Sequence, residues 1–165
     1  MLKLSFISLL FISSLANAEE TRHANVHVHG LNNLTMVLSQ NQIAITYEMP
    51  IIQLYEEHEK HEELAIKNES LKAFENHLQL FEFPIGAECE LSSFKSELHN
   101  VSTEGDHKDI ELSYEFYCNE PNLLNGIQIN AFERFDDLQM VNFDAIINNQ
   151  GFIKSFNSLE TKITF

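Results

Sequence analysis

Residues 34–50 read LTMVLSQNQIAITYEMP, which is two strand-like runs around a short polar break. Apolar or alternating side chains fill Leu34 to Leu38 and Gln42 to Met49, and three polar residues, Ser39 to Asn41, separate the two runs. Alternation with a period of two is typical of half-buried strands, and a short polar break between two such runs is typical of a hairpin. The stretch therefore predicts a β-hairpin whose second strand ends at Pro50.

Most of the chain after residue 86 has the same strand-like pattern. Residues 87–98 and 109–118 flank a polar loop that contains Thr103, Glu104 and Gly105, so we expect these two strands to pair antiparallel. The run Asn148-Asn149-Gln150-Gly151 is a strong turn signal between two later strands. Further strands are predicted at residues 126–131, 138–147, 152–156 and 161–165.

Residues 53–80 have a different period. Leu64, Leu71, Phe74 and Leu78 recur at helical spacing, while Glu, Lys, His and Asn fill the other positions. This spacing predicts one long helix. The elements together favour an α+β fold, with a mainly antiparallel β-sheet and the long helix packed against it in a single domain, residues 19–165.

The first 18 residues have the order of a secretory signal peptide. Lys3 precedes an apolar run, Leu4 to Ile12, and the small residues that end at Ala18 suit a cleavage site. The run is too short to span a hydrocarbon core, and no later stretch of the sequence is long and apolar enough to do so. We therefore expect a mature chain without a transmembrane segment, in an extracytoplasmic compartment.

The chain is strongly acidic, with a formal net charge of -15. Lys3 is the only charged side chain in residues 1–18, so cleavage would leave a net charge of about -16. Such a charge argues against nucleic acid as a partner. An acidic surface favours cations, but it is also a common route to solubility, and the charge alone does not indicate a ligand.

The two cysteines, Cys89 and Cys118, stand near the ends of strand-like stretches. An oxidising compartment would join them as a disulfide. The alternative is that both are soft metal ligands, but the chain has no third cysteine and no close C-x-x-C spacing. The sequence therefore favours a disulfide at the end of the hairpin opposite its turn.

Histidines gather after the signal peptide at His23, His27 and His29. In an extended segment His27 and His29 point to the same side, because successive side chains alternate. Three imidazoles can offer three nitrogens to a metal, and zinc accepts such ligands together with a carboxylate or a water. The alternative is that these residues are exposed polar side chains on a strand or at a frayed terminus.

Two further groups could contribute metal ligands. His58, His61 and Glu62 would share one face of the predicted helix and could hold a divalent cation, although by itself the pattern favours a solvated helix face. His107 and Asp109 would lie on one side of a strand, as would Glu111, although ordinary polar residues at a turn would look the same. Imidazole together with carboxylate suits zinc better than copper(I).

Signatures of catalysis are absent from the sequence. The helix reads His-Glu-Lys-His-Glu, which lacks the His-Glu-x-x-His spacing of zinc proteases. Neither a Gly-x-Ser-x-Gly elbow nor a phosphate-binding glycine loop occurs. We therefore do not expect an enzyme.

The order of landmarks along the chain resembles the ZrgA-like periplasmic zinc-binding proteins of Gram-negative bacteria, formerly a domain of unknown function. The resemblance covers nearly the whole mature chain. It lies in His27-Val28-His29-Gly30, Met49-Pro50, Glu57-His58, Cys89, His107 to Cys118 with Tyr114 and Phe116, and Phe132-Glu133-Arg134-Phe135. This chain departs from the pattern in lacking a long His-rich insert and in having Glu111 where relatives often have a second histidine.

The resemblance implies a periplasmic, non-catalytic protein that binds Zn²⁺ and supports zinc acquisition or homeostasis. Its expected partners are the zinc ion and a zinc importer or the importer's periplasmic binding protein. The predicted ligands are His23, His27, His29, His58, His107 and Asp109. The alternative is a structural or protein-interaction domain without a physiological metal.

Overall fold

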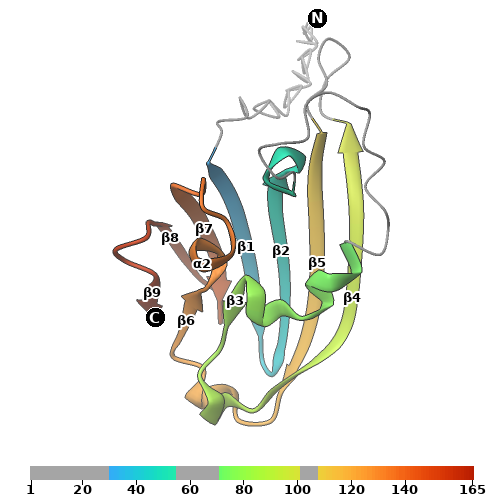
Figure 1. Ribbon diagram of the computed structural model, residues 1–165. Coiled ribbons are helices and arrows are strands. Elements are labelled where there is room, and N and C mark those ends of the chain that lie inside the picture. Colours follow the sequence, from blue (N-terminus) through green and yellow to red (C-terminus); the bar gives the residue numbers. More distant parts are fainter. Residues whose placement is uncertain (1–29, 55–70, 101–107) are drawn as a thin grey trace, which may run out of the picture.

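The computed structural model describes residues 30–54, 71–100 and 108–165, which form a mainly β structure with two sheets (Figure 1). The larger sheet has the strand order β4-β5-β2-β1-β7-β8, and the smaller has the order β3-β6-β9. The strands of the larger sheet are β1 (Leu31–Ser39), β2 (Gln42–Pro50), β4 (Cys89–Asn100), β5 (Lys108–Cys118), β7 (Met140–Ile147) and β8 (Gln150–Phe156). Those of the smaller sheet are β3 (Phe81–Glu82), β6 (Gly126–Ile129) and β9 (Lys162–Thr164).

The hairpin predicted at residues 34–50 is confirmed as β1 and β2. The two strands pair antiparallel with Leu38 opposite Ile43, and Gln40 turns the chain with a φ of 58°. Burial alternates along both strands, so that Leu34 and Tyr47 face the core while Glu48 faces solvent. The period-two pattern of the sequence therefore reports the two faces of the sheet.

The other two predicted hairpins are also confirmed. Strands β4 and β5 pair antiparallel, as do β7 and β8. Asn148 and Asn149 connect the latter pair with φ values of 50° and 69°, which suits a type I′ turn, and asparagine tolerates this left-handed region. The order of the hairpins within the sheets was not predicted: β1 lies parallel to β7, with Leu34 opposite Phe143, and β2 pairs antiparallel with β5.

The predicted α+β class with a long helix packed on the sheet is wrong. Within the described residues, Leu71 and Lys72 are helical and two 3-10 turns follow, η2 (Ala73–Glu75) and η3 (His77–Gln79). Asn76 separates these turns with the non-helical ψ of 84°. The one α-helix whose bounds fall in the described part is α2 (Ala131–Arg134).

The spacing of the apolar residues explains the error. Side chains three positions apart also lie on one side of a 3-10 turn, so Leu71 and Phe74 can both reach the core without a continuous α-helix. The Tyr114 hydroxyl donates a hydrogen bond to the Phe74 carbonyl oxygen at 2.8 Å and holds this turn on the sheet. Leu78, the next residue of the predicted stripe, is 52% exposed.

A single cluster of buried side chains fills the space between the two layers. Figure 1 shows that the short elements lie across one face of the larger sheet. These elements include the smaller sheet, α2 and the 3-10 turns η1 (Ile51–Leu54), η4 (Ile85–Ala87) and η5 (Pro121–Leu123). The cluster contains Met36, Ile45, Tyr47, Phe74, Phe81, Tyr114, Phe116, Ile127, Phe143 and Phe156. The opposite face of the larger sheet, called here the outer face, carries the alternate residues of each strand.

The predicted disulfide between Cys89 and Cys118 is confirmed. The two residues are opposite each other in the β4–β5 register, and their Cα atoms are 3.9 Å apart. The bridge lies at the end of the hairpin away from the loop 101–107, as expected.

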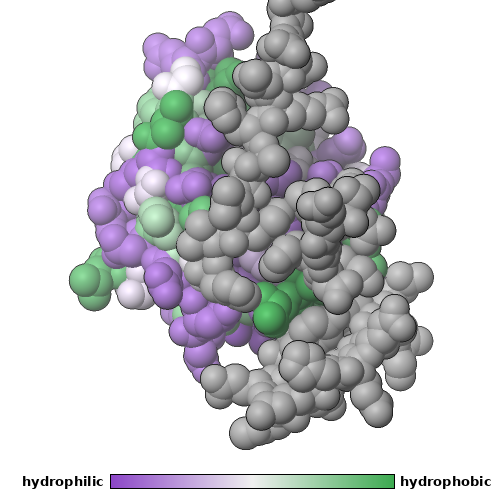
Figure 2. Space-filling model, turned by 90° about the horizontal axis from the view of Figure 1, so that it is seen from above, coloured by the Kyte–Doolittle hydropathy of each residue, from purple (hydrophilic) through white to green (hydrophobic). Residues whose placement is uncertain are grey.

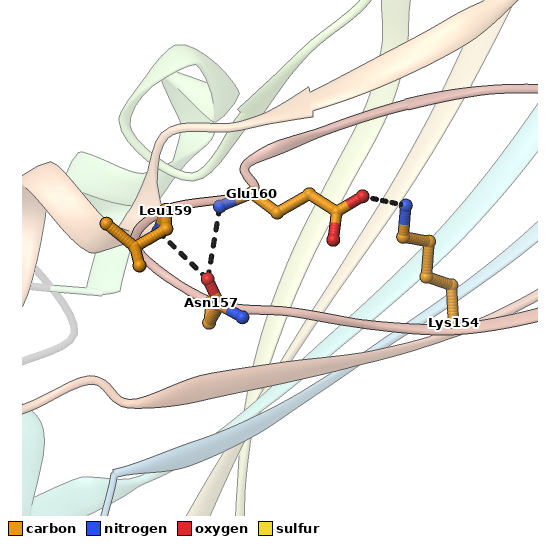
Figure 3. A network of polar contacts seen from close by, with 4 residues as sticks. All are labelled: Lys154, Asn157, Leu159 and Glu160. Carbon is orange, nitrogen blue, oxygen red and sulfur yellow. Dashed lines mark hydrogen bonds and ion pairs between the residues drawn. The ribbon is translucent and has the colours of Figure 1, made fainter.

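A polar turn connects β8 to β9 (Figure 3). The side-chain oxygen of Asn157 accepts hydrogen bonds from the backbone N–H groups of Leu159 and Glu160, at 2.9 Å and 3.1 Å. Lys154 forms an ion pair with Glu160 at 2.6 Å. Such side-chain contacts satisfy the backbone N–H donors of the turn, and the chain then continues into β9 of the smaller sheet.

The predicted signal peptide, residues 1–18, lies outside the described residues. In the part of the chain that is described, no helix has both the length and the apolar character needed to cross a membrane.

Candidate metal centre

Four strand ends lie together at one end of the larger sheet, called here the upper end (Figure 1). It is defined by Leu31 at the start of β1, Pro50 at the end of β2, Asn100 at the end of β4 and Lys108 at the start of β5. Pro50 and Asp109 are paired across β2 and β5, and Asp109 is paired with His99 across β5 and β4. Figure 2 looks down on this end, and most of the described surface visible there is hydrophilic.

Asp109 is the one predicted ligand among the described residues. It is partly buried and shares the outer face with Glu111. Ile110, which lies between these two residues, and Leu112, which follows them, are fully buried on the other face. The predicted alternation along this strand is therefore confirmed for Asp109 and Glu111. Ser113 donates a hydrogen bond to Glu111 at 3.2 Å, which orients that carboxylate on the outer face.

Two carboxylates that the sequence analysis did not consider lie beside Glu111. The register places Glu97 of β4 and Glu48 of β2 directly opposite Glu111, one on each side. Directly opposite residues have their side chains on the same face of a sheet. The outer face near the upper end thus carries a lateral row of three carboxylates, with Asp109 two residues nearer the start of β5.

Amide side chains continue this row across the sheet. Asn33 donates a long hydrogen bond of 3.5 Å to Glu48, and Asn142 donates to the side-chain oxygen of Asn33 at 3.2 Å. Ser155 in turn donates to Asn142 at 3.0 Å. The alternation of polar and apolar residues along each strand indicates which side chains face outward. Which of them become neighbours across the sheet depends on the register between strands, which local sequence patterns do not specify.

The five histidines of the predicted ligand set lie outside the described residues. These are His23, His27, His29, His58 and His107. Among residues 30–54, 71–100 and 108–165, no group of three or more His, Cys, Asp or Glu side chains is arranged to hold a metal ion. The structure therefore gives the position of Asp109 and of the strand ends, and leaves the histidine ligands as predictions.

His77 is half-buried and packs against aromatic side chains of the core, away from the upper end. Its ring lies 4.8 Å from that of Phe116, edge to face, and 5.5 Å from that of Phe81. Burial against these rings lowers the pKa of His77 below its usual value of 6.5. The neutral imidazole thus acts as a packing side chain.

The first residues of β1 are held by polar groups inside the structure. Asn32 is fully buried and donates a hydrogen bond to the Tyr47 hydroxyl at 2.7 Å, while its side-chain oxygen has no partner. Burial raises the pKa of Tyr47 above its usual value of 10.0, so the hydroxyl stays protonated. The Gly30 carbonyl oxygen accepts hydrogen bonds from the N–H groups of Gln139 and Met140, at 2.8 Å and 2.9 Å.

These features define a mainly β, disulfide-linked protein with carboxylates at one end of its larger sheet. Residues 26–165 match the model of the ZrgA family, described as a zinc uptake protein, and the chain belongs to this family. The matched range contains His27, His29, His58, His107 and Asp109, while His23 precedes it. No curated protein matches the sequence significantly. The family connects the chain with zinc uptake.

Proposed function

We propose that this protein is a non-catalytic, periplasmic accessory protein that binds Zn²⁺ and supports zinc acquisition. Zinc is its cargo, and the expected partner is a zinc importer or the importer's periplasmic binding protein. The proposed ligands come from the set His23, His27, His29, His58, His107 and Asp109, of which four complete a tetrahedral site.

The main support for a shared zinc site is that the strand ends next to these histidines lie side by side at the upper end. Leu31 and Asp109 belong to strands separated only by β2, so about 10 Å of sheet lies between them. His29 precedes Leu31 by two residues and His107 precedes Asp109 by two, and each such step spans up to about 7 Å of chain. The chain is therefore long enough for both imidazoles to meet at one ion.

His58 is within similar reach. It follows Leu54, the last residue of η1, by four positions, and η1 continues directly from the end of β2. Four residues span at most about 14 Å. Three segments that are distant in the sequence thus join the same end of the sheet, which favours one shared site over three separate ones.

The surrounding charge supports cation capture. Glu48, Glu97 and Glu111 lie on the outer face next to Asp109, and negative potential from such a group raises the local concentration of a divalent cation. Neutral imidazoles would hold zinc at neutral pH and release it as they are protonated near a pKa of about 6.5. A protein that passes zinc to an importer needs such reversible binding.

The compartment is supported by two features of different kinds. The disulfide between Cys89 and Cys118 is of the kind that persists in oxidising compartments, and residues 1–18 have the order of a signal peptide. Mass spectrometry of the protein isolated from a periplasmic fraction would test the signal peptide and the disulfide together. We expect a chain cleaved after Ala18 with its two cysteines joined.

The test of zinc binding is titration calorimetry on untagged protein. We expect the wild type to bind zinc and its thermal midpoint to rise, since a ligand that binds only the native state stabilises it. The double variant His27→Ala/His29→Ala should bind at least about tenfold more weakly. The matched control is His77→Phe, which removes an imidazole packed on Phe116 and should leave zinc affinity unchanged.

The same titration separates the competing functions. A wild-type midpoint that does not respond to zinc would favour the structural or protein-interaction domain. Equal affinities of the wild type and the His27→Ala/His29→Ala variant would instead remove these two residues from the site.

A further inference from the structure

Two large apolar side chains are exposed next to each other at the end of the molecule opposite the upper end. They are Ile85 of η4 and Leu123 of η5, which are 95% and 51% exposed. The two 3-10 turns are in contact, and a Cβ atom at Gly86 would lie 3.4 Å from the Cδ1 atom of Leu123. Figure 1 shows both turns at the bottom of the view, where η4 leads into β4 and η5 follows β5. Ile85 and Leu123 are called here the lower tip.

Backbone hydrogen bonds hold the lower tip in one conformation. The N–H of Glu88 donates to the Ile85 carbonyl oxygen at 3.1 Å, and the N–H of Leu123 donates to the Glu120 carbonyl oxygen at 3.0 Å, so each turn is closed. The N–H of Glu120 donates to the Ala87 carbonyl oxygen at 3.1 Å, which joins the two turns. The disulfide connects the first residue of β4 to the last residue of β5 beside them. The two apolar side chains are therefore presented by a braced backbone.

An exposed apolar side chain needs no explanation when it stands alone, because much of any protein surface is apolar. The lower tip differs because Ile85 and Leu123 adjoin and their backbone is fixed. A preorganised pair loses little conformational entropy when a partner covers it, so more of the hydrophobic gain remains as affinity. Aliphatic side chains held in this way are suited to fill a pocket on a partner.

The surroundings of the lower tip are acidic. Residues 81–94 and 117–129 contain four glutamates and no lysine or arginine. The four are Glu82, Glu88, Glu90 and Glu120, and all are exposed. Negative potential of this kind repels an anionic lipid surface and a second copy of this acidic chain, whereas it attracts a basic protein surface. The charge therefore selects one kind of partner.

We propose that the lower tip is a docking site for a different protein, whose binding pocket is apolar and bordered by Lys or Arg. Ile85 and Leu123 enter the pocket, while Glu88 and Glu120 face its basic border. The partner binds at the opposite end of β5 from Asp109, so it leaves the upper end of the sheet open. The inference does not require zinc binding and stands apart from the proposed function.

Photo-crosslinking in the cells that naturally make the protein tests the site. Ile85 of the full chain is replaced by the photoreactive residue p-benzoylphenylalanine. The matched control is the same replacement of Ile153 in β8, which is also isoleucine and is 88% exposed. We expect an adduct with one other protein from position 85 and not from position 153. An adduct with a second copy of this chain alone, an adduct with lipid alone, or no adduct would overturn the proposal.

The crosslinked protein, once identified by mass spectrometry, is purified and titrated against the full wild-type protein and its variants. Ile85→Ser should weaken binding by about tenfold or more, because it removes a buried aliphatic anchor without changing the charge. Ile153→Ser should leave the affinity unchanged. The double variant Glu88→Gln/Glu120→Gln should bind more weakly and should respond less to added salt, since it removes two charges that face the basic border.

Thermal midpoints and zinc titrations distinguish docking from the other effects. Because Ile85 is almost fully exposed, Ile85→Ser should keep the wild-type midpoint, and its zinc titration should equal that of the wild type. Equal partner affinities of the wild type and Ile85→Ser would overturn the docking site, as would a salt response unchanged in the double glutamate variant. A wild type that does not bind zinc would overturn the proposed function and leave the docking site standing.

Discussion

Asn32 donates a hydrogen bond to the hydroxyl oxygen of Tyr47 at 2.7 Å, with both side chains buried in the core. The pair joins β1 to β2 near the upper end and is the single buried polar contact between side chains of these strands in the described structure. Because the Asn32 oxygen has no partner, the pair depends on this one bond.

Removing the Tyr47 hydroxyl should therefore be destabilising. We expect Tyr47→Phe to lower the free energy of unfolding by about 1–3 kcal/mol, since the Asn32 amide would then be buried without any partner. Urea denaturation measures this loss. The double variant Tyr47→Phe/Asn32→Leu removes both polar groups and should recover much of the stability. A single variant as stable as the wild type would show that the bond contributes nothing.

The disulfide should contribute stability without affecting metal binding. It closes a loop with a sequence separation of 29 residues, for which the chain-entropy estimate is about 3–4 kcal/mol. The variant Cys89→Ala/Cys118→Ala should lose stability of this order, and its zinc affinity should equal that of the wild type because the bridge lies at the opposite end of β5 from Asp109. Loss of zinc affinity in this folded variant would contradict the separation of the two ends.

Stability should fall in mild acid because of His77. Its pKa is lowered in the folded state by burial, so below the unfolded-state value of about 6.5 the unfolded chain binds the proton first. The stabilisation is fully present above about pH 6.5 and is lost as the pH falls toward the lower, folded-state pKa. Urea midpoints measured with a chelator present should decrease between about pH 7.5 and pH 5.5. His77→Phe should reduce this decrease, and an unchanged pH dependence would exclude His77 as its source.

Neutralising Asp109 should weaken zinc binding. Asp109→Asn keeps the size of the side chain but removes the charge of a proposed ligand, so we expect an affinity at least about tenfold lower by calorimetry. The control is Glu115→Gln, which neutralises an exposed carboxylate on the same strand and the same face, six residues from Asp109. If both variants bind zinc with the same affinity, the Asp109 carboxylate contributes only through its charge and is not a ligand.

The hairpins could be predicted because their signals are local. Leu34 to Met49 alternates along each strand, and the asparagine pair at residues 148 and 149 marks its turn by residue type. The parallel contact of Leu34 with Phe143 could not be predicted, since it joins residues far apart and depends on the register of the whole sheet.

The absence of the predicted long helix from the described residues and the row of carboxylates show two other limits of prediction from sequence. Leu71 and Phe74 have a spacing that both an α-helix and a 3-10 turn satisfy, so periodicity alone could not exclude the shorter elements. Glu48 and Glu97 come from separate strands and meet Glu111 only through pairing. Of the predicted ligand set, only Asp109 falls in the described part of the chain, and its outward side was predictable from the alternation of β5.

We propose that imidazoles from separate segments meet Asp109 at one zinc ion. This can be tested by anomalous diffraction at the zinc edge from crystals of the zinc-loaded protein. We expect one strong peak at the upper end of the larger sheet, with the Asp109 carboxylate and at least two imidazole nitrogens at about 2.0–2.2 Å from the ion. A peak elsewhere on the protein would contradict the shared site. A fully occupied zinc ion at the upper end without histidine ligands would contradict it as well.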